Sequence, residues 1–146
     1  NFHLNFLEDI FDILAQQLQD QQSALLQNLL APQNSILPDY KKSTGVVAED
    51  FSLAGIFYYT GMTGNVTANL TNFSLAASTA TNVTHVIIQG ATPYGITALQ
   101  IGGVAQTINW QAATIPVGTT SRKDVMNFTV MNLSGVWTVL GQLTSF

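Results

Sequence analysis

The sequence has no cysteine and very little charge. Its 146 residues include four Lys and Arg together and eight Asp and Glu, so that charged residues make up 8% of the chain. Ordinary globular proteins contain about 25%. The lack of cysteine excludes the disulfide framework on which many small secreted domains depend. A net charge of −4 without any basic stripe argues against a nucleic-acid partner.

Charge is missing altogether between Phe51 and Ser121, where no Asp, Glu, Lys or Arg occurs. Charge normally keeps folded proteins apart in solution, so a surface without it needs another form of protection. Asn-x-Ser/Thr triplets, which accept N-linked glycans, are concentrated in the second half of the chain. Their six acceptors are Asn65, Asn69, Asn72, Asn82, Asn127 and Asn132. We therefore predict a glycoprotein in which sugar replaces charge; the alternative is that Asn and Thr are merely abundant in turns and strands.

The acceptor triplets also predict an extracellular, cell-surface location, because N-linked glycans are added to exported proteins. A chain that begins at Asn1 rather than Met fits a processed, secreted protein. On this interpretation the chain meets a membrane only during export or before assembly.

Residues 1–31 are predicted to form an amphipathic helix. At about 100° per residue, one heptad stripe and the positions beside it give an apolar face, and the acidic residues lie on the other side. The predicted assembly residues are Leu4, Phe6, Leu7, Ile10, Phe11, Ile13, Leu14, Leu18, Leu25 and Leu29. The apolar arc covers about 180°, whereas a helix with a single partner needs only about 100°. We therefore expect the helix to contact two neighbours.

Length and charge limit where this apolar face can be buried. A helix of these residues spans roughly 46 Å, and a domain of about 100 residues has a radius of gyration near 13 Å, so the helix should overhang its own domain. Its carboxylates argue against a transmembrane span, and its lack of Lys and Arg argues against a membrane-surface helix. Self-association is the favoured interpretation, and packing against the chain's own second part is the alternative.

Residues 32–45 are predicted to be a linker, with Pro32 ending the helix. Residues 46–146 alternate apolar and polar positions between turn residues, which is typical of short strands. Hairpin turns are predicted at Gly102–Gly103 and Ser134–Gly135. The expected fold class is therefore α+β: a long N-terminal helix followed by an antiparallel β-sandwich of immunoglobulin-like size, with about seven or eight strands.

Strand geometry makes the glycan prediction more specific. In an Asn-x-Thr triplet on a strand, Asn and Thr share one face and the middle residue takes the other. That middle residue is apolar at every site: Val66, Leu70, Phe73, Val83, Phe128 and Leu133. We expect the acceptors to face solvent and the middle residues to join the core. Asn72 is out of phase with Asn69, so a bulge or turn is expected near Thr71.

The sequence contains no recognisable catalytic or metal-binding constellation. His85 shares its predicted strand face with aliphatic residues, which favours a core or interface histidine. Glu49 and Asp50 are adjacent and would point to opposite faces, which is poor spacing for acid–base work, and Asp124 is expected in a solvated turn. We expect no enzyme activity, cofactor, metal ion or small-molecule substrate. The aromatic residues that would either build a sugar-stacking face or, as we favour, belong to the core are Tyr58, Tyr59, Tyr94, Trp110 and Trp137.

A long N-terminal helix, a short linker and a cysteine-free β-domain with glycan acceptors resemble, in architecture, archaeal pilin-like subunits of extracellular filaments. The resemblance implies a structural subunit that polymerises through its helix. Pilin-type helices are almost wholly apolar near the mature N-terminus, and Glu8, Asp9 and Asp12 depart from that pattern. Assembly through strands shared between neighbours would also suit the composition.

The second interpretation is a glycosylated viral coat or spike protein, or a cell-surface adhesin, with a carbohydrate-binding β-domain and a coiled-coil helix. In both cases the expected partners are further copies of the chain and covalent N-glycans. A polymer of indefinite length favours the filament, and a closed trimer or tetramer favours the spike or adhesin.

Overall fold

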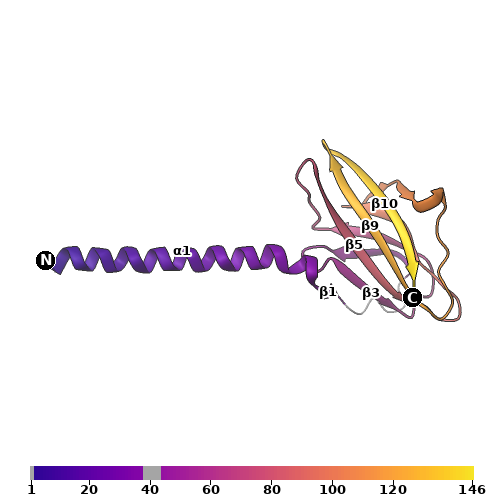
Figure 1. Ribbon diagram of the computed structural model, residues 1–146, viewed down its shortest axis with the longest axis horizontal. Coiled ribbons are helices and arrows are strands. Elements are labelled where there is room, and N and C mark those ends of the chain that lie inside the picture. Colours follow the sequence, from indigo (N-terminus) through magenta and orange to yellow (C-terminus); the bar gives the residue numbers. More distant parts are fainter. Residues whose placement is uncertain (1, 38–43) are drawn as a thin grey trace. The chain divides into compact units, whose positions relative to one another are not determined.

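The computed structural model describes the backbone of residues 2–37 and 44–146, and the side chains of residues 3–25, 35–36 and 44–146. The chain divides into two compact units, Asn1–Ala31 and Pro32–Phe146. A single long helix dominates the first unit and two mixed β-sheets make up most of the second (Figure 1). The α+β class with an N-terminal helix is therefore confirmed.

Helix α1 (Phe2–Asn34) is continuous. It is rich in Leu and Gln and contains no Gly, so many of its residues have good helix propensity. The prediction that Pro32 ends the helix is wrong, because α1 continues for two more residues. Proline lacks one backbone N–H, and within the last turn this removes only one hydrogen bond from the helix.

The larger sheet has six strands in the order β1-β3-β5-β9-β10-β8. Their bounds are β1 (Ile36–Leu37), β3 (Ile56–Thr60), β5 (Thr79–Ile88), β8 (Ile108–Trp110), β9 (Lys123–Leu133) and β10 (Val136–Ser145). The three long strands β5, β9 and β10 lie side by side and are antiparallel, as Figure 1 shows. The pairs β1–β3, β3–β5 and β8–β10 are parallel.

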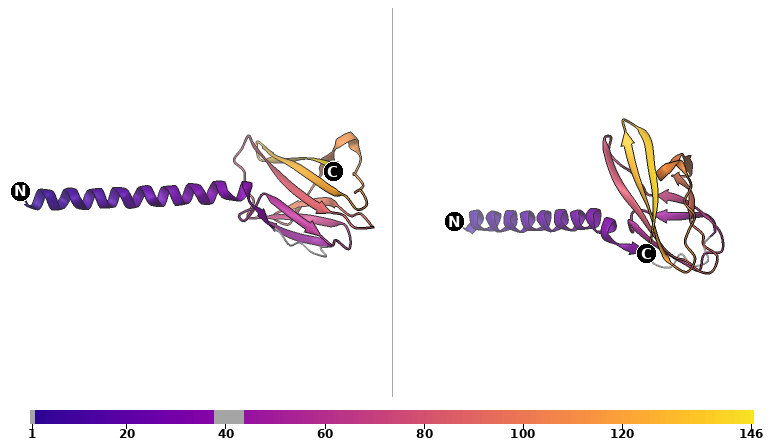
Figure 2. Two further views of the ribbon diagram at one scale, coloured as in Figure 1. Left: turned by 60° about the horizontal axis from the view of Figure 1, so that its bottom comes forward. Right: turned by 45° about the vertical axis from the view of Figure 1, so that its right-hand side comes forward.

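The smaller sheet has four strands in the order β2-β4-β6-β7. Their bounds are β2 (Gly45–Asp50), β4 (Val66–Thr71), β6 (Ile96–Ile101) and β7 (Val104–Gln106). The pairs β2–β4 and β4–β6 are parallel, and β6–β7 is antiparallel. Figure 2 shows the strands of this unit from two further directions.

The prediction of a purely antiparallel arrangement is wrong. From β2 to β6 the chain alternates between the sheets, so β3 separates β2 from β4 and β5 separates β4 from β6. A strand that returns to its own sheet after visiting the other can run in its earlier direction, which produces parallel neighbours. The sheets also contain three strands of only two or three residues, β1, β7 and β8, and β1 lies within the predicted linker. Residues 38–43 of that linker lie outside the described residues.

Both predicted hairpin turns are confirmed. Gly102–Gly103 joins β6 to β7, and Ser134–Gly135 joins β9 to β10. All four residues have positive φ, between 52° and 87°, as a two-residue turn between twisted strands requires. The segment Val104–Trp110 that follows the first of these turns is divided between β7 in the smaller sheet and β8 in the larger sheet.

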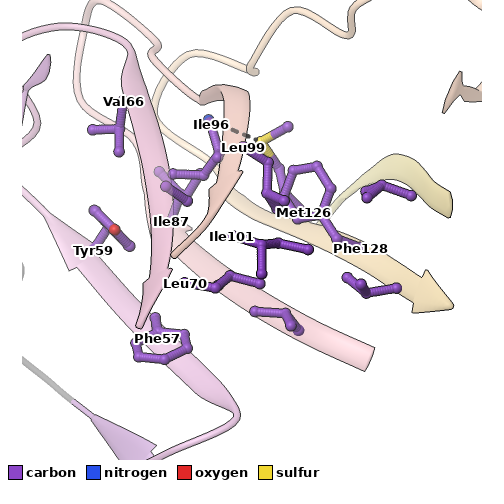
Figure 3. Packing of buried hydrophobic residues seen from close by; sticks show 14 of the residues in the cluster. Phe57, Tyr59, Val66, Leu70, Ile87, Ile96, Leu99, Ile101, Met126 and Phe128 are labelled. Atoms are coloured by element: carbon purple, nitrogen blue, oxygen red, sulfur yellow. Dashed lines mark hydrogen bonds between the residues drawn. The ribbon is translucent and has the colours of Figure 1, made fainter. Parts of the chain in front are cut away.

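One buried cluster joins the two sheets (Figure 3). The larger sheet contributes Phe57 and Phe128, and the smaller sheet contributes Val66 and Leu70, all with no exposed surface. Burial of each such side chain contributes about 1.5–3 kcal/mol. Because both sheets supply the same core, the arrangement is sandwich-like.

Candidate functional site

The predicted assembly face of α1 consists of exposed apolar side chains. Phe11 is 70% exposed, and even the least exposed of the set, Ile10, is 37% exposed. The nine predicted residues whose side chains are described are Leu4, Phe6, Leu7, Ile10, Phe11, Ile13, Leu14, Leu18 and Leu25, and all are exposed. The side chain of Leu29 lies outside the described residues. On the polar face, Gln16 Nε2 donates a hydrogen bond to Asp20 Oδ1 at 3.0 Å.

The six glycan acceptors lie at or near the surface of the second unit. Asn65, Asn72 and Asn82 are exposed, and the other three are half-buried. Among the middle residues of the triplets, Val66, Leu70, Val83 and Phe128 are fully buried and Phe73 packs partly buried against the core.

Two acceptor triplets depart from the simple alternation of solvent-facing and core-facing residues along a strand. Leu133 was expected in the core but is 50% exposed, because it is the last residue of β9 and precedes the hairpin turn. Asn72 follows the end of β4 with a φ of 50°, so the turn expected near Thr71 is confirmed.

The side-chain amides of the acceptors differ in their hydrogen bonds. Asn65 Oδ1 accepts from the Gly95 backbone N–H at 3.1 Å, and Asn69 Oδ1 accepts from that of Gly103 at 2.8 Å. Within the described residues, neither Nδ2 donates a hydrogen bond, so the nitrogen that would carry a sugar is free. Asn132 differs, because its Nδ2 donates to the Leu75 carbonyl at 2.9 Å.

Two acceptor triplets face each other across β5 and β9. The antiparallel register pairs Asn82 with Thr129, and Thr84 with Asn127. The Thr129 hydroxyl donates to Asn82 Oδ1 at 2.9 Å, and the Thr84 hydroxyl donates to Asn127 Oδ1 at 3.0 Å. Asn127 Nδ2 also lies 3.4 Å from Asn82 Oδ1. The Thr hydroxyl of each triplet therefore donates a hydrogen bond to the acceptor amide of the other triplet.

These hydrogen bonds predict unequal glycan occupancy. We expect the chain, when exported from a host with N-glycosylation, to carry sugar at Asn65, Asn69 and Asn82, whose Nδ2 atoms are free. Occupancy should be lower at Asn132 and Asn72, because modification there disturbs the hydrogen bonds that their Nδ2 atoms donate to the Leu75 carbonyl and to Asp50 Oδ1. Intact mass and peptide mapping test this: a mass equal to that of the bare 15.7-kDa chain would refute the glycan prediction.

A fully buried polar cluster connects the two sheets. Glu49 lies on β2 of the smaller sheet, while Tyr59 and His85 lie on β3 and β5 of the larger sheet. His85 Nε2 lies 2.7 Å from Glu49 Oε1, and the Tyr59 hydroxyl donates to Glu49 Oε2 at 2.5 Å. The core position predicted for His85 is confirmed, since it has no exposed surface. Its partner Glu49 lies 36 residues away, and local spacing could not identify it.

The prediction that Asp124 occupies a solvated turn is wrong. Asp124 is fully buried on β9, where its Oδ2 accepts from Gln89 Nε2 at 3.0 Å and from the Thr119 backbone N–H at 2.7 Å. Its exposed neighbours Arg122 and Lys123 suggested a turn, but β9 begins at Lys123 and directs the next side chain inward.

The hydrogen bonds of Asp50 lower the pKa of its side chain. The Ser52 hydroxyl and Asn72 Nδ2 donate to Asp50 Oδ1 at 2.6 and 3.1 Å. They hold the pKa of Asp50 below its ordinary value of 3.8, and the Ser52 backbone N–H adds to this, while partial burial acts in the opposite direction.

This lowered pKa predicts a small loss of stability in acid. Because the pKa is lower in the folded state, the carboxylate stabilises the fold above pH 3.8 and this contribution disappears as pH falls through the folded pKa. Urea unfolding at pH 6 and pH 2.5 should therefore show a smaller pH dependence for Asp50→Asn than for the unsubstituted chain. Identical pH dependences would contradict the assignment.

Of the five candidate aromatic residues, Tyr59 belongs to the core, and Trp110 and Trp137 pack against it. Tyr59 is buried with His85, Trp110 contacts Phe128 with ring centroids 5.6 Å apart, and Trp137 contacts Phe73 at the same separation. The described part of the chain contains no group of three His, Asp or Glu side chains able to hold a metal ion.

Comparison with protein-family models, with curated protein sequences and with solved structures found no match. In the described ranges, no helix is long and apolar enough to cross a membrane. The exposed helix face and the acceptor asparagines are therefore the features on which a functional inference rests.

Proposed function

We propose that the chain is a structural subunit of an extracellular, N-glycosylated surface filament, similar to a pilus or thread and of the archaeal pilin-like kind that its architecture resembles. It polymerises through α1, and its second unit forms a β-sandwich that carries the sugar coat of the outer wall. The observation that carries this proposal is the set of nine exposed apolar side chains on α1.

The energetics of that face favour association. Burial of a Leu, Ile or Phe side chain contributes about 1.5–3 kcal/mol, so a helix that leaves nine of them in water loses a large stabilisation. Soluble monomers rarely keep a continuous apolar surface of this kind. The acidic residues occupy the opposite side of α1 and remain in solvent when the apolar face is covered.

The width of the face supports an open polymer. An apolar arc of about 180° exceeds the roughly 100° that one partner covers, so each helix can contact neighbours on both sides. If one part of the face on one helix contacts a different part of the face on the next helix, the same contact repeats from subunit to subunit. The result is an open polymer, unless the rotation between subunits completes a ring.

Shared strands provide a second means of association. β7 is an edge strand of the smaller sheet, and its Val104 is 63% exposed. Unpaired backbone groups on such an edge can accept a strand from another chain. We propose this contact as an addition to helix packing.

A spike or adhesin with a coiled-coil helix is the second candidate. It is favoured by the 3–4 spacing of Leu4, Leu7, Phe11, Leu14 and Leu18, the pattern of a closed helix bundle. Light scattering separates the two candidates. A filament subunit is expected to increase in mean mass without limit as its concentration rises, and a constant mass of three or four chains would replace the filament proposal with the spike or adhesin.

A further inference from the structure

A groove of about 310 Å³ lies between the segment that leads into β6 and residues 115–118. Its volume is at the lower end of ordinary ligand sites. The lining residues that matter here are Asn65, Pro93, Tyr94, Thr97, Ile115 and Val117. None of the described residues that line the groove is charged, so the groove suits a neutral ligand.

The two walls of this groove are fixed by one buried pair of polar side chains. Gln89 and Asp124 are both buried, and Gln89 Nε2 donates to Asp124 Oδ2 at 3.0 Å. Gln89 also holds one wall, because its Nε2 donates to the Tyr94 carbonyl at 2.6 Å and its Oε1 accepts from the Tyr94 backbone N–H at 3.0 Å. Asp124 Oδ2 holds the other wall, since it accepts from the backbone N–H of Thr119, which follows residues 115–118, at 2.7 Å. The groove is therefore shaped before any ligand enters it, which reduces the cost of binding.

Gly118 allows the two walls to approach each other. A Cβ at this position would lie 2.5 Å from Gln89 Nε2 and 3.0 Å from Pro93 Cβ. A larger residue would therefore push the walls apart and change the shape of the groove.

Much of the lining is apolar and open to water. Val117 is 81% exposed and Ile115 is 51% exposed, while Pro93 and Tyr94 are half-buried. All four residues belong to the part of the chain that contains no charge. Because covering apolar surface is favourable, the lining favours a ligand that has an apolar face.

The glycan acceptor Asn65 lines the same groove. Its Oδ1 accepts from the Gly95 backbone N–H at 3.1 Å, which fixes the side-chain amide. Within the described residues its Nδ2 donates no hydrogen bond, so a sugar can be attached without breaking a contact. Because Asn65 is itself part of the lining, a glycan on this residue begins at the groove.

We propose that this groove holds the first sugars of an N-linked glycan attached to Asn65 of the same chain. A sugar ring has an apolar C–H face that fits Tyr94 and Val117, and its hydroxyls can exchange hydrogen bonds with the Thr97 hydroxyl. The glycan in turn covers Ile115 and Val117, which would otherwise remain in water. This inference rests on the proposed glycosylation of the chain, and it does not depend on assembly through α1.

Hydroxyl-radical footprinting, which oxidises exposed side chains, tests the proposal on the glycosylated chain. Thr67→Ala removes the acceptor triplet of Asn65 but leaves Asn65 and its hydrogen bond to Gly95 in place. A ligand that fills a groove of this size covers much of the lining, so oxidation of Ile115 and Val117 should rise at least about twofold in the Thr67→Ala variant.

Thr71→Ala is the matched control. It makes the same change on the same strand, β4, but removes the triplet of Asn69, which does not line the groove. This variant should keep the oxidation level of the unsubstituted chain. In chains produced without glycans, the unsubstituted chain and Thr67→Ala should be oxidised equally, which separates the effect of the sugar from that of the substitution.

Peptide mapping of the same samples shows whether Asn65 carries sugar. A bare Asn65 would overturn the proposal. So would equal oxidation of Ile115 and Val117 in the glycosylated unsubstituted chain and the glycosylated Thr67→Ala variant. Light scattering reports assembly separately, so failure of the glycan groove and failure of the filament proposal give different results.

Discussion

Replacement of His85 by leucine is expected to lower the free energy of unfolding of the sheet unit by about 3–5 kcal/mol, the usual effect of removing one partner from a buried pair of ionisable side chains. His85 Nε2 lies 2.7 Å from Glu49 Oε1, and neither side chain has any exposed surface. Without His85, that carboxylate oxygen is buried with no partner and cannot be reached by water. Urea unfolding, followed by the fluorescence of Trp110 and Trp137, measures the loss.

Two controls show whether the loss arises from Glu49. Tyr59→Phe removes one hydrogen bond to the same carboxylate and should cost less, about 1–3 kcal/mol. Adding Glu49→Leu to His85→Leu removes the unpaired carboxyl group and should restore much of the stability. Replacing both members of a buried pair by apolar residues often changes the free energy of unfolding very little. If His85→Leu costs under 1 kcal/mol, or if the double variant is the less stable, the cluster does not hold the sheets together.

Replacement of Leu7 and Leu14 by serine is expected to raise the concentration needed for assembly by at least about a hundredfold. Both side chains are about half exposed and lie on the heptad stripe, seven residues apart. Each loses about 1.5–3 kcal/mol of burial in the assembly, and 1.4 kcal/mol corresponds to a factor of ten in an equilibrium constant. Sedimentation of the chain over a range of concentrations measures the change.

The matched control places the same substitution on the polar face. Gln16→Ser with Gln19→Ser also introduces two serines into α1, at positions opposite the apolar arc. This variant should assemble at the concentration of the unsubstituted chain. Circular dichroism of both variants determines whether the helix persists. Equal assembly of the Leu7/Leu14 variant and the Gln16/Gln19 variant would exclude the apolar face as the contact surface.

Local patterns predicted most elements of the fold. Heptad periodicity predicted α1, and the glycine pair Gly102–Gly103 predicted a hairpin because two adjacent residues needed positive φ. Alternation predicted that His85 faces the core and that Val66 and Phe128, in the middle of acceptor triplets, are buried. Each of these properties depends on a few neighbouring residues, so the sequence contains it directly.

Long-range partners could not be predicted in the same way. The parallel pairs result from a chain that alternates between two sheets, and no local signal marks which sheet a strand will join. Glu49 contacts His85, which lies 36 residues away in the sequence, and Asp124 accepts from Gln89, which lies 35 residues away. The close packing of Trp110 against Gly141 depends on the absence of a side chain at Gly141, which has meaning only when β8 lies beside β10.

Electron microscopy of the purified, glycosylated chain tests the filament proposal most directly, because it shows the assembly itself. We predict filaments of uniform width and indefinite length for the unsubstituted chain and for the Gln16/Gln19 variant, and none for the Leu7/Leu14 variant at the same concentration. Closed particles of fixed size, or filaments that persist when Leu7 and Leu14 are replaced, would contradict polymerisation through α1.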